Sequence, residues 1–249
     1  MARPKSQSTS RFNQRFAASL DMTLLVRADF SIRATVTPEQ HQWTPSPQPG
    51  VDRVMLDRVG AEKARATSLV RYAPASVFPP HTHFGGEEIL VLEGTFSDAT
   101  GDYAAGHYLR NPPGSQHAPF SADGALLFVK LSQMPGDEGR PVRVNTRDDS
   151  QWLTLGQRQV CPLFTGDLEQ VVLLKLPAGA RVLGGPVDGA ELLVLDGELN
   201  EAQQRYATRS WLRLPAGDYP ELRAGEDGAT LYLKTGAIRP LGTVPEPTQ

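Results

Sequence analysis

The chain has 249 residues, of which 39% are hydrophobic and 21% are charged, an ordinary composition for a globular protein. Its net charge of -3 gives no electrostatic reason to expect a nucleic acid or an anionic membrane as a partner, and no apolar stretch approaches a membrane span. The single cysteine, Cys161, excludes an intramolecular disulfide and a cysteine-based zinc cluster. We therefore expect a cytoplasmic protein that binds neither nucleic acid nor membrane.

The chain begins with residues 1–22, which lack the apolar core of a secretory signal and are expected to be a flexible tail. Short apolar segments separated by turns rich in glycine and proline follow, and no segment shows a convincing helical period. Many short strands at regular spacing favour an all-β sandwich or barrel. The polar, glycine-containing segment 135–149 is the best linker candidate, and short strands return after it. We expect domains at 23–134 and 150–240 on either side of this linker, and a second tail at 241–249.

Residues 81–94 read HTHFGGEEILVLEG and combine two histidines with a carboxylate. Side chains alternate faces along a strand, so His81 and His83 project to the same side, and Glu87 keeps their parity unless the two glycines change it. Imidazole nitrogen and carboxylate oxygen are ligands for zinc, iron, nickel or manganese. The segment therefore predicts a metal site that needs at least one further ligand from elsewhere.

The second half of the chain repeats the first. A shift of 103 residues lays 88–94 (EILVLEG) on 191–197 (ELLVLDG), and 108–114 (YLRNPPG) on 211–217 (WLRLPAG). Two copies of one all-β unit explain this pattern most simply. Residues that occur in both copies are assigned to the fold: Leu92, Gly94, Arg110, Pro112 and Gly114.

The same comparison separates metal ligands from scaffold. The second copy lacks the histidines and the first glutamate, with Gly184, Pro186 and Ala190 at the equivalent positions. Glu88 keeps a counterpart, Glu191, in this ligand-free copy, so we assign Glu88 a structural role and Glu87 to the metal. His117 aligns with Pro220 of the second copy, so the repeat does not require a histidine there. It follows a tight turn and belongs to a different strand from His81 and His83, so we assign it as the remaining ligand.

These residues resemble the two sequence motifs of the cupin family. The first motif, G-x5-H-x-H-x3,4-E-x6-G, is matched by His81, His83, Glu87 and Gly94, with Ala75 in place of its first glycine. The second motif, G-x5-P-x-G-x2-H-x3-N, is matched by Gly106, Pro112, Gly114 and His117, with Ser121 in place of its asparagine. The resemblance implies two tandem jelly-roll barrels, the second of which has lost its ligands. Phe84 and Phe120, which flank the ligands, are expected to line the barrel.

More narrowly, the segments 81–94 and 96–117 resemble the cupin domain of ChrR-type anti-sigma factors and their stand-alone relatives. The resemblance is dense over 35–135 and fainter over 150–235. It implies one divalent metal per chain in the barrel mouth, held by three histidines and one glutamate, with zinc as the metal associated with ChrR. ChrR also carries an N-terminal zinc-binding helical domain with histidine and cysteine ligands that holds the sigma factor. The first 20 residues here contain neither residue type, so we expect no sigma-factor binding.

Two functions are consistent with this sequence. The first is a regulatory or sensing bicupin that binds a small-molecule ligand through an open metal position and forms a homodimer. The second is an enzyme, an iron-dependent dioxygenase acting on a small diketone- or catechol-like substrate. The sequence offers no convincing general base, so no catalytic residue is assigned beyond the metal set.

Overall fold

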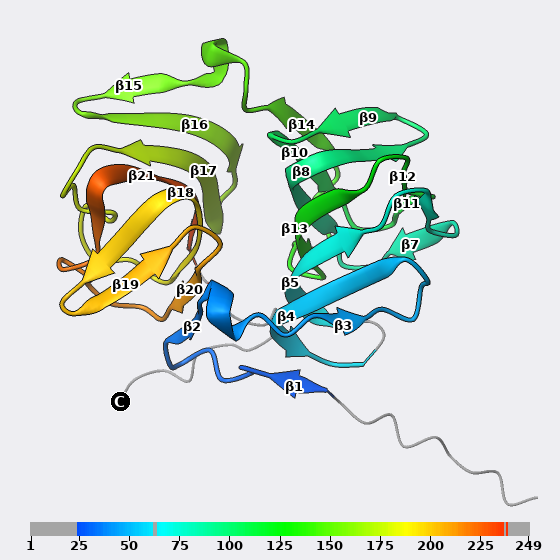
Figure 1. The fold of residues 1–249 in the computed structure, drawn as a ribbon, viewed down its shortest axis with the longest axis horizontal. Helices are drawn as coiled ribbons and strands as arrows, with labels where there is room; N and C mark the ends of the chain where they lie inside the picture. The colour runs from blue at the N-terminus through cyan, green and yellow to red at the C-terminus, as the bar shows by residue number, and fades with distance from the viewer. Residues whose placement is uncertain (1–23, 62–63, 237, 239–249) are drawn as a thin grey trace, which may run out of the picture.

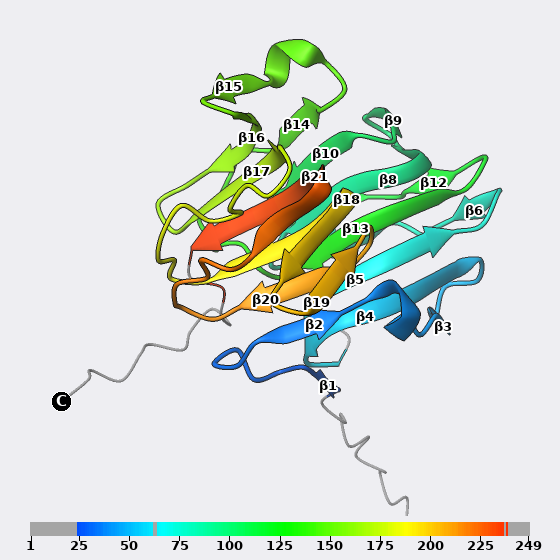
Figure 2. The same cartoon turned by 60° about the vertical axis from the view of Figure 1, so that its left-hand side comes forward.

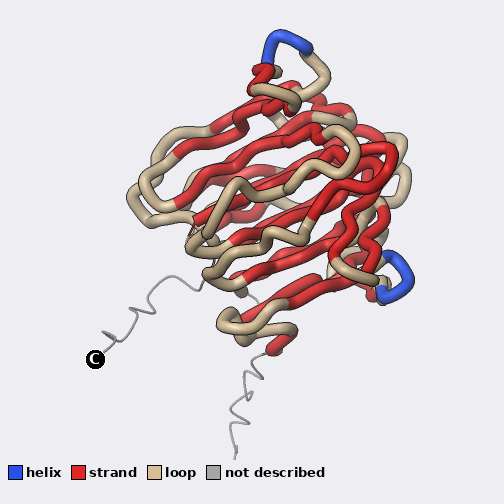
Figure 3. The backbone as a smooth tube through the Cα atoms, turned by 90° about the vertical axis from the view of Figure 1, so that its left-hand side faces the viewer, coloured by secondary structure: helices blue, strands red, loops and turns tan. Residues whose placement is uncertain are grey.

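The computed structural model describes residues 24–61, 64–236 and 238, so the tails expected at 1–22 and 241–249 lie outside the described residues. The described part consists of strands, loops and two short 3-10 turns, η1 (Pro38–Gln40) and η2 (Asp149–Gln151), without any α-helix (Figure 3). It therefore holds no helix long and apolar enough to cross a membrane. The all-β prediction is confirmed, and the strands form two barrels that lie side by side (Figure 1).

The first barrel is built around one long sheet with the strand order β1-β4-β5-β13-β8-β10-β14. Its strands are β1 (Leu25–Val26), β4 (Val51–Val59), β5 (Arg65–Tyr72), β8 (Glu87–Asp98), β10 (His107–Asn111), β13 (Ala125–Leu131) and β14 (Val142–Asn145). Shorter strands pair at its edges and across its mouth: β3 (Thr44–Pro45), β6 (Ser76–Val77), β7 (His81–His83), β9 (Gly101–Ala104), β11 (Ser115–His117) and β12 (Phe120–Ser121).

The second barrel has the sheet order β15-β16-β17-β21-β18-β20-β2, with β19 paired to β18. Its strands are β2 (Ala34–Val36), β15 (Leu153–Leu155), β16 (Arg158–Thr165), β17 (Glu169–Leu176), β18 (Ala190–Glu201), β19 (Gln204–Ala207), β20 (Trp211–Leu214) and β21 (Arg223–Gly236). The repeated segments 88–94 and 191–197 lie in the long strands β8 and β18, which occupy equivalent positions in the two sheets.

Two short strands pair outside the domains in which the sequence analysis placed them. The exact domain boundaries remain a prediction. β2 comes early in the chain, yet it pairs with β20 of the second barrel, with Ala34 opposite Arg213 (Figure 2). β14 lies inside the segment 135–149 that we expected to be a linker, and it pairs with β10 of the first barrel. Each barrel is therefore completed by a strand that the sequence pattern does not assign to it.

The main sheet of the first barrel is buried on both faces. In β8, Ile89 and Val91 point into the barrel and pack with Leu127, whereas Leu90 packs with Phe128 against the second barrel. This double burial is the physical reason for the continuous apolar run at 89–92, since alternation with polar residues is expected only where one face meets water.

Glycines shared by the two copies allow backbone conformations and close backbone contacts that other residues would not. Gly94 has φ +68° and Gly197 has φ +69°, a region that side chains other than glycine adopt at a cost. A Cβ at Gly94 would meet the carbonyl oxygen of Gly124, and one at Gly197 would meet that of Gly228. The prediction that Gly94 belongs to the scaffold is confirmed.

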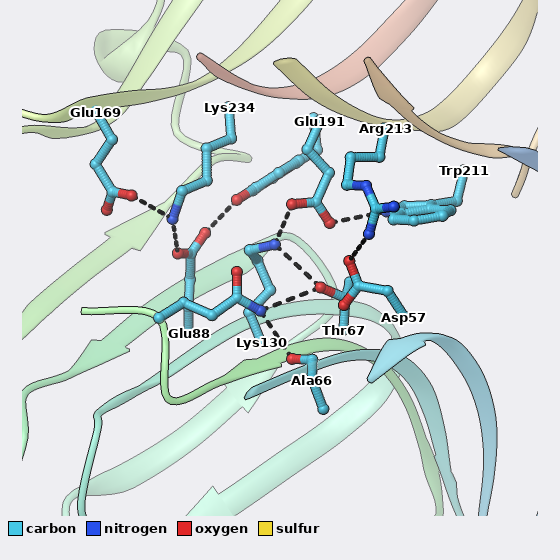
Figure 4. Close-up of polar contacts among 12 residues, drawn as sticks. Asp57, Ala66, Thr67, Glu88, Lys130, Glu169, Glu191, Trp211, Arg213 and Lys234 are labelled. Carbon is cyan, nitrogen blue, oxygen red and sulfur yellow. Dashed lines mark hydrogen bonds and ion pairs between the residues drawn. The ribbon is translucent and has the colours of Figure 1, made fainter. Parts of the chain in front are cut away.

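The facing sheets enclose a network of buried charges (Figure 4). Glu88 accepts hydrogen bonds from Arg110 at 3.1 Å and from Lys234 of the second barrel at 3.2 Å. Its counterpart Glu191 pairs with Lys130 of the first barrel and accepts a hydrogen bond from Trp211 at 2.8 Å. Glu88 therefore points away from the barrel interior and holds the two barrels together, which is the structural role predicted for it.

Candidate metal centre

Three histidines come together at the mouth of the first barrel. The short strands β7 and β11 pair in antiparallel register, which places His117 directly opposite His81. His83 shares the face of His81 because the two positions are two residues apart on one strand. One ring nitrogen from each of the three histidines lies within 4.8 Å of the other two, an arrangement that can hold a metal ion.

Glu87 reaches the same point from the beginning of β8. The turn between His83 and Glu87 contains Gly86 with φ +77°, a conformation that glycine adopts freely. Glu87 Oε2 lies 3.3 Å from His83 Nε2 and 3.4 Å from His117 Nε2, and the side chain is buried. The structure thus brings together all four residues that the sequence singled out.

Hydrogen bonds fix the tautomers of two of the imidazoles. His81 Nδ1 lies 2.9 Å from the carbonyl oxygen of Pro79, and His117 Nδ1 lies 3.1 Å from Asp98 Oδ2. Carbonyl and carboxylate oxygens accept, so each Nδ1 carries the hydrogen and each Nε2 keeps its lone pair. His83 Nε2 and His117 Nε2 are only 2.9 Å apart beside Glu87. This donor set fits a divalent cation, with the carbonyl and carboxylate acting as outer partners of the ligands.

The protonation states also suit a cation. Burial, with a smaller electrostatic contribution from neighbouring His81, lowers the pKa of His83 to about 4, so its imidazole is neutral at neutral pH. Burial raises the pKa of Glu87, although His117 and Asn111 oppose that shift. A cation at the histidines would stabilise the ionised carboxylate and so reverse the effect of burial.

Two residues outside the predicted set position Glu87. Asn111 pairs with Glu87 in the register of β10 and β8, and its Nδ2 donates to Glu87 Oε2 at 3.0 Å. Arg143 of β14 in turn donates through Nη2 to Asn111 Oδ1 at 2.7 Å. Asn111 could have been found in the sequence, because Leu214 replaces it in the copy without ligands. Arg143 gives no such signal, since it reaches the site only through the strand that was expected to be a linker.

Two of the three histidines, His81 and His83, line a cavity of about 380 Å³ inside the barrel. Its walls are mainly apolar and come from β5, β8 and β13, with Val70, Ile89, Leu127, Val129 and Leu131 among them. Tyr72 also lines the cavity, and burial together with the Glu87 carboxylate raises the pKa of its phenol, which therefore stays protonated. The cavity gives a small molecule direct access to the histidine cluster.

The prediction that the two flanking phenylalanines line the barrel is only partly right. Phe84 is 65% exposed and Phe120 is 39% exposed, so neither is part of the barrel core. Phe84 lies in the turn that follows His83 and still lines the cavity, together with Phe78 and Phe96. Phe120 is not among the residues that line the cavity.

Comparison with known protein families gives one match, to the family described as ChrR Cupin-like domain, over residues 31–135. Residues 31–135 are a ChrR cupin-like domain. This domain carries the histidine cluster, and a second barrel with its own sheet follows it in the chain. A comparison with curated proteins found no match.

Solved structures share the fold of the whole chain. A provisionally assigned glyoxylate-induced protein from Pseudomonas aeruginosa has a TM-score of 0.64 at 16% identity, covering 98% of this chain and 100% of that one. The pirin YhhW from Escherichia coli in complex with nickel(II) has a TM-score of 0.60 at 12% identity, covering 82% and 98%. A provisionally assigned dioxygenase from Nostoc punctiforme has a TM-score of 0.60 at 13% identity, covering 90% and 85%. At these identities the likeness concerns the fold.

Proposed function

We propose that the ChrR-like cupin domain binds one divalent metal through His81, His83, Glu87 and His117, and captures a small molecule at the open metal position. The observation that carries this proposal is the convergence of three imidazole nitrogens and one buried carboxylate at the edge of a cavity. Four protein ligands would leave two positions open on an octahedral ion, or one if Glu87 bound through both oxygens, and the cavity supplies the room for their occupant.

The metal would act as a Lewis acid toward an oxygen atom of the captured molecule. The remaining roles belong to the protein. Asp98 and the carbonyl of Pro79 orient the imidazoles, Asn111 holds the Glu87 carboxylate, and the apolar walls keep bulk water from the ligand. The described residues of the cavity wall include no acid other than Glu87 and no histidine other than His81 and His83. This lack of an acid–base partner favours binding, and hence a sensing or regulatory role, over catalysis.

Zinc is the first choice of metal, on the strength of the ChrR-like domain, and iron, nickel and manganese share the ligand preference. Protein purified without added metal is expected to contain about one zinc per chain by elemental analysis. His81→Ala and His117→Ala should each lose most of this metal. His107→Ala is the matched control, because this histidine bonds to the carbonyl of Ala104 and lies outside the cluster. Full metal content in both cluster variants would refute the site.

A second candidate function is an iron-dependent dioxygenase. The provisionally assigned dioxygenase among the similar structures favours it, as do the mainly apolar walls of the cavity beside the histidines. Reconstitution with ferrous iron and addition of a β-diketone or a catechol would test it by oxygen uptake. Turnover that depends on iron and is lost in His117→Ala would replace the binding role with a catalytic one.

A further inference from the structure

The cavity beside the histidine cluster has a second polar end, formed by two arginines of β4. Arg53 and Arg58 both line the cavity, together with Ala66, Ser68 and Val70 of the neighbouring strand β5. In β4, Val51 and Arg53 share the face that points into the barrel, and a bulge between Met55 and Asp57 returns Arg58 to that face. The arginines are therefore part of the inner wall.

Arg53 has no acidic partner among the described residues. Its Nε is buried and makes no hydrogen bond. The acids close to it in sequence are engaged elsewhere, since Asp52 pairs with Arg71 at 3.0 Å and Asp57 pairs with Arg65 at 3.2 Å and with Arg213 at 3.0 Å. Arg53 is half-buried, and a guanidinium whose buried Nε has no hydrogen-bond partner has capacity for an anion.

Arg58 strengthens the positive end of the cavity. Its side chain is buried, and its Nε and Nη2 donate to the carbonyl oxygens of Gly60 and Ala61, which orient the guanidinium without neutralising it. Burial and the charge of Arg53 both lower the pKa of Arg58, as expected for two like charges on one wall. Glu87 is the only acid among the described residues that line the cavity, and its carboxylate faces the histidines.

The sheet register sets the span between the two polar ends. Glu87 lies opposite Leu131, Leu131 opposite Ala66, and Ala66 opposite Arg58, so one row of residues crosses four strands from the histidine end to the arginine end. At a strand spacing of about 4.8 Å, the path along the curved sheet between the two ends of this row is about 14 Å, and the direct distance between the backbones is shorter. Long side chains reach inward from both ends, which leaves between them a length suited to a small molecule.

We propose that the cavity selects a small aliphatic dicarboxylate, with one carboxylate at the metal site and the other on Arg53 and Arg58. This inference rests on the proposed metal-binding function and adds the class of ligand. A guanidinium pairs with a carboxylate through two parallel hydrogen bonds. The apolar side chains between the ends, such as Val70, Leu127 and Val129, suit a carbon chain better than an inorganic anion.

The test is calorimetric titration of metal-loaded protein with malonate, succinate, glutarate and adipate, and with the monomethyl ester of the tightest binder. The ester is expected to bind about 10- to 100-fold more weakly, as for loss of one charge-assisted hydrogen-bonded pair. Arg53→Met should remove this preference while keeping the metal. Arg71→Met is the matched control, because Arg71 pairs with Asp52 on the outside of the barrel and should leave the preference unchanged.

Several outcomes would overturn the inference. These are no binding of any dicarboxylate to the metal-loaded protein, phosphate binding as tightly as the best dicarboxylate, or an unchanged preference in Arg53→Met. Equal affinity in metal-free protein would also overturn it, because the ligand would then not bridge to the metal. Measuring the metal content of the same samples distinguishes failure of the proposed metal-binding function from failure of the dicarboxylate proposal. A wild-type protein that fails to bind metal refutes the proposed function, whereas metal-loaded Arg53→Met with an intact preference refutes only the dicarboxylate.

Discussion

Lys130 and Lys234 each bind the glutamate of the opposite barrel. In its own sheet, Lys130 lies beside Glu88 and Lys234 lies beside Glu191. Across the interface the partners are exchanged, so that Lys130 binds Glu191 and Lys234 donates to Glu88 at 3.2 Å (Figure 4). All four residues are buried. The repeated strands thus also form the interface between the two barrels, and each barrel supplies the lysine that pairs with the other barrel's glutamate.

Lys130→Met should destabilise the protein by about 3–5 kcal/mol, because it leaves the Glu191 carboxylate buried without a cation. Urea unfolding measures the change. The surface pair of Arg71 and Asp52 provides the control, and Arg71→Met is expected to cost about 0–1 kcal/mol. The double variant Lys130→Met with Glu191→Leu should recover part of the lost stability. A single variant as stable as wild type would show that the pair contributes nothing.

Stability should fall in acid through the same network. Burial disfavours the charge of Glu191, but Lys130 outweighs it and lowers the pKa of Glu191 to about 2 from an ordinary value of 4.5. A carboxylate whose folded pKa is lowered contributes stability that is complete above the ordinary value and is lost as pH falls toward the folded pKa. The unfolding free energy should therefore decrease between these two values. Glu191→Gln should show a shallower decrease over this range, and an identical pH profile would contradict the assignment.

Replacing Asn111 with leucine, the residue at the equivalent position of the second copy, should weaken metal binding by about 10- to 100-fold. Asn111 Nδ2 holds Glu87 Oε2, so its loss lets the carboxylate rotate away from the histidines. Competition with a chromogenic chelator measures the affinity. Arg143→Met should have a smaller effect in the same direction, since Arg143 acts only through Asn111. Unchanged affinity in Asn111→Leu would exclude this positioning role.

Gly94→Ala should destabilise the fold more than Gly114→Ala. Both glycines have positive φ, +68° and +82°, so both substitutions carry the cost of placing a side chain in that region. A Cβ at Gly94 also meets the backbone of Gly124 and Ala125, whereas one at Gly114 meets nothing within 4 Å. Thermal unfolding should rank wild type above Gly114→Ala and Gly114→Ala above Gly94→Ala. Equal midpoints for the two variants would show that the backbone contact has no effect.

Local patterns in the sequence were sufficient for the ligand cluster and for the barrels. The two-residue spacing of His81 and His83 is kept in β7. The contrast between the two copies agrees with the positions of the two glutamates, since Glu87 lies beside His83 and Glu88 pairs with Arg110. These features depend on the spacing of neighbouring residues or on comparison with the internal repeat, and a single sequence contains both kinds of information.

Features that depend on tertiary pairing were not predictable. Arg143 supports Glu87 from a strand that resembles a linker, and Arg53 reads as one charged residue among many until the sheet places it in the cavity wall. Asp98 lies at the far end of β8 from Glu87, yet it binds His117 because the barrel closes on itself. No sequence period encodes contacts of this kind, which arise from the closure of the sheets.

The pairing of β2 with β20 has a consequence for how the protein is made. The partner of Ala34–Val36 lies at Trp211–Leu214, near the other end of the chain, so these residues have no sheet to join until the ribosome has completed most of the polypeptide. Until then the second barrel lacks its edge strand, and Ala34 and Val36 remain exposed on the nascent chain. The second barrel should therefore be completed last by β2, a strand that is synthesised before all the other strands of that barrel.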